Sequence, residues 1–137
     1  MTKPPLADVP VRSAEDLTRR WTLLLDPPVF SARSLWLTFF DDGLMSPVVI
    51  PVDDVPAVPD RPLLANVVAV CETIVGSHVA STPHVAMALC RPGRPVVTTD
   101  DEAWERALRE AFEPTGGTWS LHLAAGGDVL PMVDLPA

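Results

Sequence analysis

The 137-residue chain contains no tyrosine, only two cysteines and only three histidines. The cysteines, Cys71 and Cys90, are too few for a disulfide framework, and we expect both to be buried, reduced thiols. No apolar run reaches the roughly 18 residues that a membrane-spanning helix needs. The first residues lack the apolar segment of a signal peptide. We therefore expect a cytoplasmic protein.

Basic residues are also scarce. Ten Lys and Arg against eighteen Asp and Glu give a formal net charge of −8, and the pI is about 4.6. This charge opposes binding to phosphate backbones, so we expect no nucleic-acid partner. A local basic patch at Arg91 and Arg94 is an alternative, but we favour two solvated loop arginines.

Apolar residues, in contrast, are plentiful. Hydrophobic residues make up 47% of the chain and charged residues 20%, with a mean hydropathy of +0.23. A chain of this length forms one domain around a single core, and its composition leaves some apolar surface for a partner. We expect a flexible, proline-rich N-terminus over residues 1–10 and a single domain over residues 11–137.

Hydrophobic periodicity and turn residues predict eight elements in the order αββαβαββ. The predicted helices cover residues 14–25, 63–78 and 100–112, and the predicted strands cover residues 34–40, 44–52, 85–90, 118–124 and 129–133. Pro47 places the second strand at a sheet edge or at a bulge. The proline-rich segment 51–62 is interpreted as a stiff loop rather than a polyproline ligand. This order predicts an α/β (α+β) fold, in which a mixed β-sheet is packed with helices.

The four tryptophans are predicted to belong to the core. Trp21 and Trp104 lie on the apolar stripes of the first and last predicted helices, and Trp36 and Trp119 lie on predicted strands. Large aromatic side chains are the main contributors of buried apolar area in a domain of this size. We favour this interpretation over a ligand-binding platform.

The stretch from His84 to Phe112 is the most informative part of the chain. An apolar strand leads into the loop 90–97, which contains Pro92-Gly93, and a helix begins within residues 98–101. The succession resembles the RadC-like branch of the JAB/MPN metal-dependent domains, whose motif is His-x-His-Pro-Ser-Gly-x4-Ser-x-x-Asp. The resemblance covers roughly residues 11–132 and implies that family's cytidine-deaminase-like architecture.

The residues that carry the chemistry of that family are mostly replaced. In the family, two histidines and the aspartate hold zinc, a glutamate is the general base, and the serine helps to stabilise the oxyanion. The resemblance places Leu89 and Arg91 at the histidine positions, with Thr98 and Asp101 at the serine and aspartate positions. The strand 44–52 contains no glutamate. An aliphatic side chain cannot bind zinc, and a guanidinium group repels it.

The two remaining motif residues also have a structural explanation. Thr98-x-x-Asp101 and Thr99-x-x-Glu102 both have the spacing of a capping box at a helix start. We favour this role over a surviving metal ligand. A cap contributes about 0.5–2 kcal/mol, so Thr99→Ala is predicted to destabilise the fold.

Substitute zinc ligands are poorly placed in the predicted structure. Cys90 follows Leu89 in a strand and therefore points to the opposite face, and His84 lies too early in the same strand. We interpret His78 and His122 as residues that satisfy a helix dipole or lie half-buried. The chain also contains no P-loop, no dinucleotide-binding motif and no Gly-x-Ser-x-Gly nucleophile elbow.

We therefore expect a catalytically inactive RadC-like domain without a metal cofactor, which binds another protein or a small ligand. Arg91 in the family's cation pocket suits an anion such as a carboxylate. The alternatives are a zinc-dependent isopeptidase or peptidase with unconventional ligands, and a structural subunit such as a homodimer formed through a hairpin edge or the apolar surface. The predicted ligand pocket consists of Leu89, Arg91, Pro92, Gly93, Arg94, Thr98 and Asp101.

Overall fold

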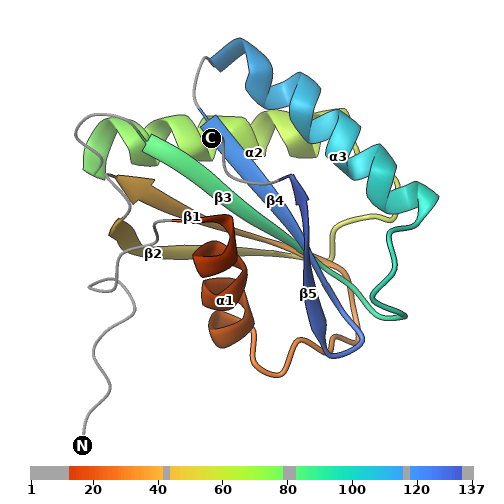
Figure 1. Ribbon diagram of the computed structural model, residues 1–137. Helices are drawn as coiled ribbons and strands as arrows, with labels where there is room; N and C mark the ends of the chain where they lie inside the picture. Colours follow the sequence, from red (N-terminus) through yellow and green to blue (C-terminus); the bar gives the residue numbers. More distant parts are fainter. Residues whose placement is uncertain (1–12, 42–43, 79–82, 116–117, 134–137) are drawn as a thin grey trace, which may run out of the picture.

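The computed structural model describes residues 13–41, 44–78, 83–115 and 118–133 (Figure 1). The predicted N-terminal segment 1–10 and the turn residues 42–43 lie outside this part of the chain. The structure confirms the predicted α+β fold, and each helix or strand end lies within two residues of its predicted place. The elements are α1 (Ala14–Leu24), β1 (Ser34–Asp41), β2 (Leu44–Asp53), α2 (Arg61–His78), β3 (Pro83–Cys90), α3 (Thr99–Phe112), η2 (Glu113–Thr115), β4 (Thr118–Ala125) and β5 (Asp128–Val133).

The five strands form one mixed sheet in the order β2-β1-β3-β4-β5. Strands β3 and β4 are parallel, because α3 crosses over between them, and the other neighbouring pairs are antiparallel. Helices α2 and α3 cover one face of the sheet, and α1 lies against the other (Figure 1). No helix in the described residues is long and apolar enough to cross a membrane.

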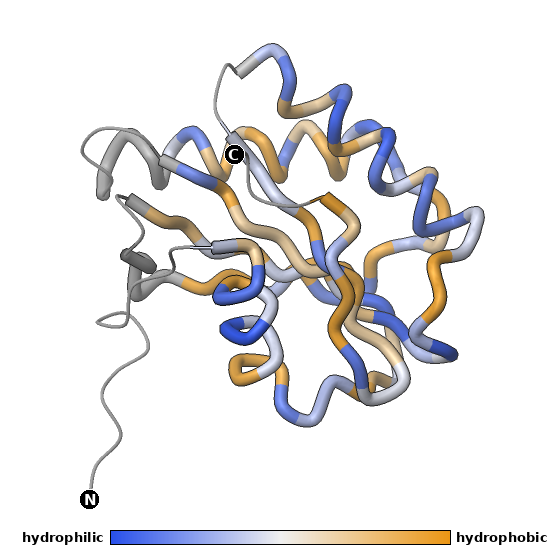
Figure 2. The backbone as a smooth tube through the Cα atoms, viewed as in Figure 1, coloured by the Kyte–Doolittle hydropathy of each residue, from blue (hydrophilic) through white to orange (hydrophobic). Residues whose placement is uncertain are grey.

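Strand β3 contributes to both faces of the core. Val85, Met87 and Leu89 join the cluster under α2 and α3, whereas the small residues Ala86 and Ala88 join the cluster under α1. This division follows from the two-residue repeat of a strand, which sends neighbouring side chains to opposite faces. Along α3, hydrophobic and hydrophilic residues alternate with the helical turn, which gives this helix one apolar stripe (Figure 2).

The predictions for the tryptophans and for α2 are confirmed. Trp21 and Trp104 are fully buried, and Leu64, Val67 and Cys71 on α2 are between 3% and 8% exposed. Trp36 and Trp119 are half-buried against the two core clusters. The predicted stiff loop 51–62 is shorter than expected, because residues 51–53 extend β2 and residues 61–62 begin α2.

Pro47 lies both at a sheet edge and at an irregularity, as predicted. In the described sheet β2 pairs only with β1. The pairing shifts between Thr38 opposite Val49 and Phe40 opposite Met45, so extra residues of β2 bulge out around Pro47. A bulge on an edge strand tolerates a residue that has no N–H to donate.

Candidate functional site

Arg91, the first residue after β3, is the centre of the loop that leads into α3. Its Nε and Nη2 atoms donate to the Asp101 carboxylate oxygens at 2.8 and 2.7 Å. Nη1 donates to the carbonyl oxygens of Pro92 and Arg94 at 2.9 and 3.1 Å, and Nη2 also donates to that of Val96 at 2.8 Å. These five bonds use all five N–H donors of a guanidinium group.

The interpretation of Arg91 as a solvated arginine is therefore wrong. Its side chain is 4% exposed, whereas Arg94 is exposed, as expected. In this arrangement Arg91 has no donor left for an external anion. The loop 92–96 is folded around the guanidinium, so that backbone carbonyl oxygens converge on it.

Glycines at two positions allow this close packing. Gly93 has a φ of +102°, and a Cβ placed on it would lie 3.2 Å from Arg91 Nη1. Gly126, in the turn between β4 and β5, has a φ of +57°, and a Cβ there would lie 2.7 Å from Pro95 Cδ. Both positions favour glycine because side chains are strained at positive φ and have no room here.

Asp101 lies on the other side of the same cluster, in the first turn of α3. The Thr98 N–H donates to Asp101 Oδ2 at 2.9 Å, and the Asp101 N–H donates to Thr98 Oγ1 at 3.3 Å. The predicted capping box is thus confirmed for Thr98 and Asp101. The prediction for Thr99 is wrong, because Thr99 is the first helical residue and Thr98 is the N-cap.

The charges of the pair are fixed by their contacts. Burial alone would raise the pKa of Asp101, but the hydrogen bonds from Arg91 and Thr98, together with the charge of Arg91, hold this pKa below its usual value. The hydrogen bond to Asp101 raises the pKa of Arg91. Both groups are therefore ionised at neutral pH, and each neutralises the other inside the protein.

These residues do not fit a zinc ion. Leu89 is fully buried in the core under α2 and α3, and the Arg91 cation lies 2.7 Å from the Asp101 oxygen that would have to bind the metal. Cys90 faces the α1 side of the sheet, as predicted, and burial raises the pKa of its thiol to about 12. The described part of the chain contains no group of three or more His, Cys, Asp or Glu residues that could hold a metal ion.

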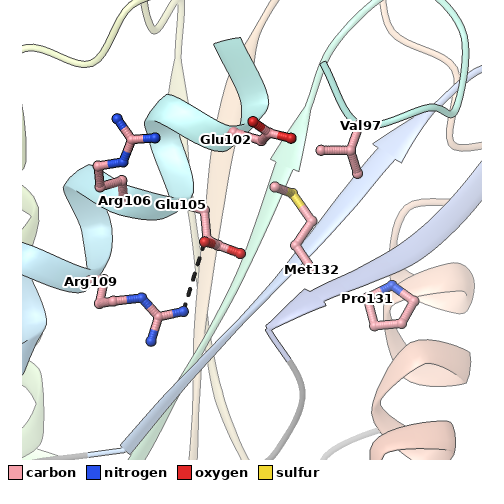
Figure 3. A pocket seen from close by; sticks show the side chains of 7 residues that line it. All are labelled: Val97, Glu102, Glu105, Arg106, Arg109, Pro131 and Met132. Atoms are coloured by element: carbon pink, nitrogen blue, oxygen red, sulfur yellow. Dashed lines mark ion pairs between the residues drawn. The ribbon is translucent and has the colours of Figure 1, made fainter. Parts of the chain in front are cut away.

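A shallow groove of about 500 Å³ lies beside this cluster, between α3 and β5 (Figure 3). Arg109 forms an ion pair with Glu105 at 3.8 Å and stacks over the Trp119 ring, with its Cζ atom 5.5 Å from the ring centroid. Of the predicted pocket residues none lines this groove. The residues that line it are Val97, Glu102, Glu105, Arg106, Arg109, Pro131 and Met132.

A buried polar cluster on the α1 face of the sheet was missed by sequence analysis. The His84 ring is held on both sides, with Nδ1 2.8 Å from Thr118 Oγ1 and Nε2 2.9 Å from Ser120 Oγ. Burial lowers the pKa of His84 to about 4. His122 is fully buried rather than half-buried, and its Nε2 lies 2.8 Å from Thr18 Oγ1 on α1.

The sequence contains a signal for this cluster. Thr118, Ser120 and His122 alternate with Trp119, Leu121 and Leu123, which is the two-residue repeat of a strand with one polar face. That face is usually solvated, but here Ser120 and His122 are fully buried, and His122 contacts Thr18 of α1. The side chain of His78 lies outside the part of the structure that is described.

The loops at one end of the sheet expose a set of valines. Ser34 is level with Asp53 and with Cys90, and Cys90 is level with Ala124. The loop that precedes Ser34 and the loops that follow Asp53, Cys90 and Ala125 therefore meet at one end of the sheet (Figure 1). Six large hydrophobic side chains are exposed among the described residues. Four of them lie on these loops and form what we call the valine surface: Val29, Val58, Val96 and Val97, with exposed fractions between 41% and 66%.

Comparisons with known proteins do not assign the chain to a family. A scan of the sequence against protein-family models finds no match, and a search of curated proteins finds none that is significantly similar.

Proposed function

We propose that this protein is a non-catalytic domain of the RadC-like kind that acts as a protein-binding module. The buried Arg91–Asp101 pair is the observation that carries this proposal. The carboxylate at the position of the family's metal-binding aspartate receives a bidentate arginine at 2.7 and 2.8 Å and also caps α3. A metal ion would have to displace the arginine and leave its charge buried and unpaired, which costs several kcal/mol.

A protein partner is favoured over a small anionic ligand. Arg91 is the buried arginine of the degenerate motif, and all five of its N–H donors already bind groups of the protein itself. The groove beside it is open and lined by both acidic and basic side chains. An exposed apolar surface on rigid loops, in contrast, is typical of a protein-binding site.

The cytoplasm is the compartment that suits this proposal. Cys71 and Cys90 are buried, free thiols, and burial raises the pKa of each to about 12. Such thiols are inert and are typical of proteins kept in a reducing compartment.

Metal content and hydrolase activity test the proposal. Protein purified without chelator is analysed for zinc by mass spectrometry and incubated, with and without added zinc, with fluorogenic peptide and isopeptide substrates. We expect zinc far below one equivalent and no hydrolysis above the buffer rate.

The alternative, a zinc hydrolase with unconventional ligands, makes the opposite prediction. Stoichiometric zinc that is lost in Asp101→Asn but kept in Thr98→Ala would overturn the proposal. Because Thr98→Ala weakens the same helix cap without removing the carboxylate, it controls for loss of metal through local unfolding.

A further inference from the structure

We infer that the valine surface docks a basic segment of another protein, in which aliphatic side chains cover the valines and Lys or Arg side chains pair with the carboxylates around them. This inference rests on the proposed function and adds the place and the chemistry of the partner. It depends on three features of the loops: their clustering, their rigidity and their charge.

The clustering is the first feature. Four of the six exposed large hydrophobic side chains of the described residues lie on loops at one end of the sheet, and the other two, Leu23 and Val70, lie apart on α1 and α2. Single exposed apolar residues are ordinary, whereas four of six on the loops at one end of the sheet are a concentration of apolar side chains of the kind found at binding sites. Val97 also borders the groove beside β5, so the valine surface adjoins a depression (Figure 3).

The loops hold one another in place. The Gly127 N–H donates to the Pro28 carbonyl oxygen at 3.1 Å, and the Val55 N–H donates to that of Arg33 at 3.2 Å. The Trp104 indole donates to the carbonyl oxygens of Pro56 and Ala57 at 3.1 and 3.2 Å. Gly126 packs against Pro95, and the Arg91 guanidinium organises the loop that carries Val96 and Val97.

Rigidity of this kind favours binding. Residues 26–33, 53–61, 91–102 and 126–128 include six prolines. A surface that is already ordered loses little conformational entropy when a partner covers it. A purely structural role for the loops would not require valines on their outer side.

The charge of these loops selects a basic partner. The same four segments contain eight carboxylates and four arginines, which leaves a net charge of −4 on this end of the molecule. One of the arginines, Arg91, is buried against Asp101, and Arg33 lies 4.0 Å from Asp100. The remaining carboxylates lie on the same loop segments as the valines and repel nucleic acids and anionic membranes, so a basic protein segment has the complementary charge.

The test is a selection of random 12-residue peptides displayed on phage against the immobilised protein. We expect the recovered peptides to combine Lys or Arg with aliphatic residues, and their affinities are then measured by fluorescence anisotropy with synthetic copies. The double variant Val96→Ser/Val97→Ser should weaken binding at least about tenfold, since it removes two of the four apolar side chains of the surface.

Matched variants distinguish loss of the valine surface from loss of exposed apolar or acidic side chains elsewhere on the molecule. Leu23→Ser/Val70→Ser removes two exposed apolar side chains elsewhere and should leave binding unchanged. Asp54→Asn/Asp60→Asn should weaken binding and reduce its salt dependence, whereas Glu72→Gln/Glu113→Gln should change neither, because these glutamates are remote from the loops. Circular dichroism verifies that each variant is folded.

Three outcomes would overturn this inference. Recovered peptides without excess positive charge, or equal affinities for the Val96→Ser/Val97→Ser variant and the parent, would each do so. A concentration-dependent dimer that the same double variant dissociates in sedimentation experiments would identify a second copy of the chain as the occupant instead. None of these outcomes concerns zinc or hydrolysis, so the proposed function can fail or stand independently.

Discussion

At the scale of single residues, Arg91 and Asp101 decide how the loop between β3 and α3 is interpreted. A buried ion pair contributes little net stability compared with well-packed apolar residues, but breaking one by removing a partner is costly because a charge remains buried alone. The pair, together with the carbonyl oxygens that accept from Arg91, therefore explains how the loop is ordered. Because each charge neutralises the other, the effect of a substitution at Arg91 is expected to depend on the residue at position 101.

We predict that Arg91→Met lowers the free energy of unfolding by about 3–5 kcal/mol, because it leaves the Asp101 carboxylate buried and unpaired. The double variant Arg91→Met/Asp101→Asn should be destabilised by less than the sum of the two single variants, with a coupling energy of about 1–3 kcal/mol. Urea unfolding of the four proteins measures this cycle. Strict additivity would mean that the two side chains do not interact in solution.

His84 makes stability depend on pH. Burial lowers its folded-state pKa from the ordinary value of 6.5 to about 4. Between these two values the unfolded chain binds a proton that the folded protein does not, so stability rises with pH across this window. The contribution is fully present above pH 6.5 and is lost as the pH falls toward 4.

We predict that lowering the pH from 7.5 to 5 costs the protein about 2 kcal/mol of stability through His84, as the linkage relation requires for this pair of pKa values. His84→Gln removes the titrating group and retains polar atoms that can reach Thr118 or Ser120. Its stability, measured by urea unfolding at several pH values, should show a pH dependence smaller by that amount. If the free energy of unfolding of this variant changes with pH as steeply as that of the parent, a group other than His84 titrates in this window.

At the scale of elements, the cap of α3 belongs to the same structure as the buried pair. Thr98 accepts the Asp101 N–H and Asp101 accepts the Thr98 N–H, so the helix start and the loop are stabilised together. Thr99 has no such role, because it lies in the first turn and its side chain is exposed. The two neighbouring threonines therefore form a matched pair for an experiment.

We predict that Thr98→Ala lowers the free energy of unfolding by about 1 kcal/mol, the usual cost of losing an N-cap side chain. Thr99→Ala should change it by no more than about 0.5 kcal/mol, as is typical for an exposed site without special contacts. Thermal or urea unfolding compares the two. A larger effect at Thr99 would show that the helix begins one residue later in solution.

The same elements show what local sequence can and cannot predict. Helix and strand positions were predictable because periodicity, turn residues and prolines act over a few residues. The parallel pairing of β3 with β4 was not, since it depends on contacts between residues more than 30 positions apart, such as His84 with Thr118. A sequence order alone is compatible with several sheet topologies.

The candidate site was predictable in outline but not in its chemistry. The cap at Thr98 follows from a local spacing. The burial of Arg91 does not, because an arginine between a strand and a Pro-Gly step has the composition of a solvated loop. Its burial depends on an aspartate ten residues away and on carbonyl groups that converge only when the loop closes around it.

At the scale of the whole molecule, the two edges of the sheet oppose assembly through strand pairing. Strand β2 forms one edge and contains Pro47 and Pro51, and strand β5 forms the other and contains Pro131. A proline has no N–H to donate, so a strand of a second molecule meets an interrupted row of donors at either edge. This argues against a homodimer formed through a hairpin edge.

We therefore predict that the protein remains monomeric in sedimentation equilibrium over a wide range of concentrations. Pro131→Val returns a backbone donor and a β-branched side chain to the edge, and it should increase self-association, because an unprotected edge strand pairs readily. Pro114→Ala, outside the sheet, is the control and should behave as the parent does. A dimer of the parent protein in which hydrogen exchange protects the β5 amides would contradict the prediction, since it would show that an edge interrupted by proline still pairs. A monomer leaves the valine surface accessible, as the inferred docking of a basic protein segment requires.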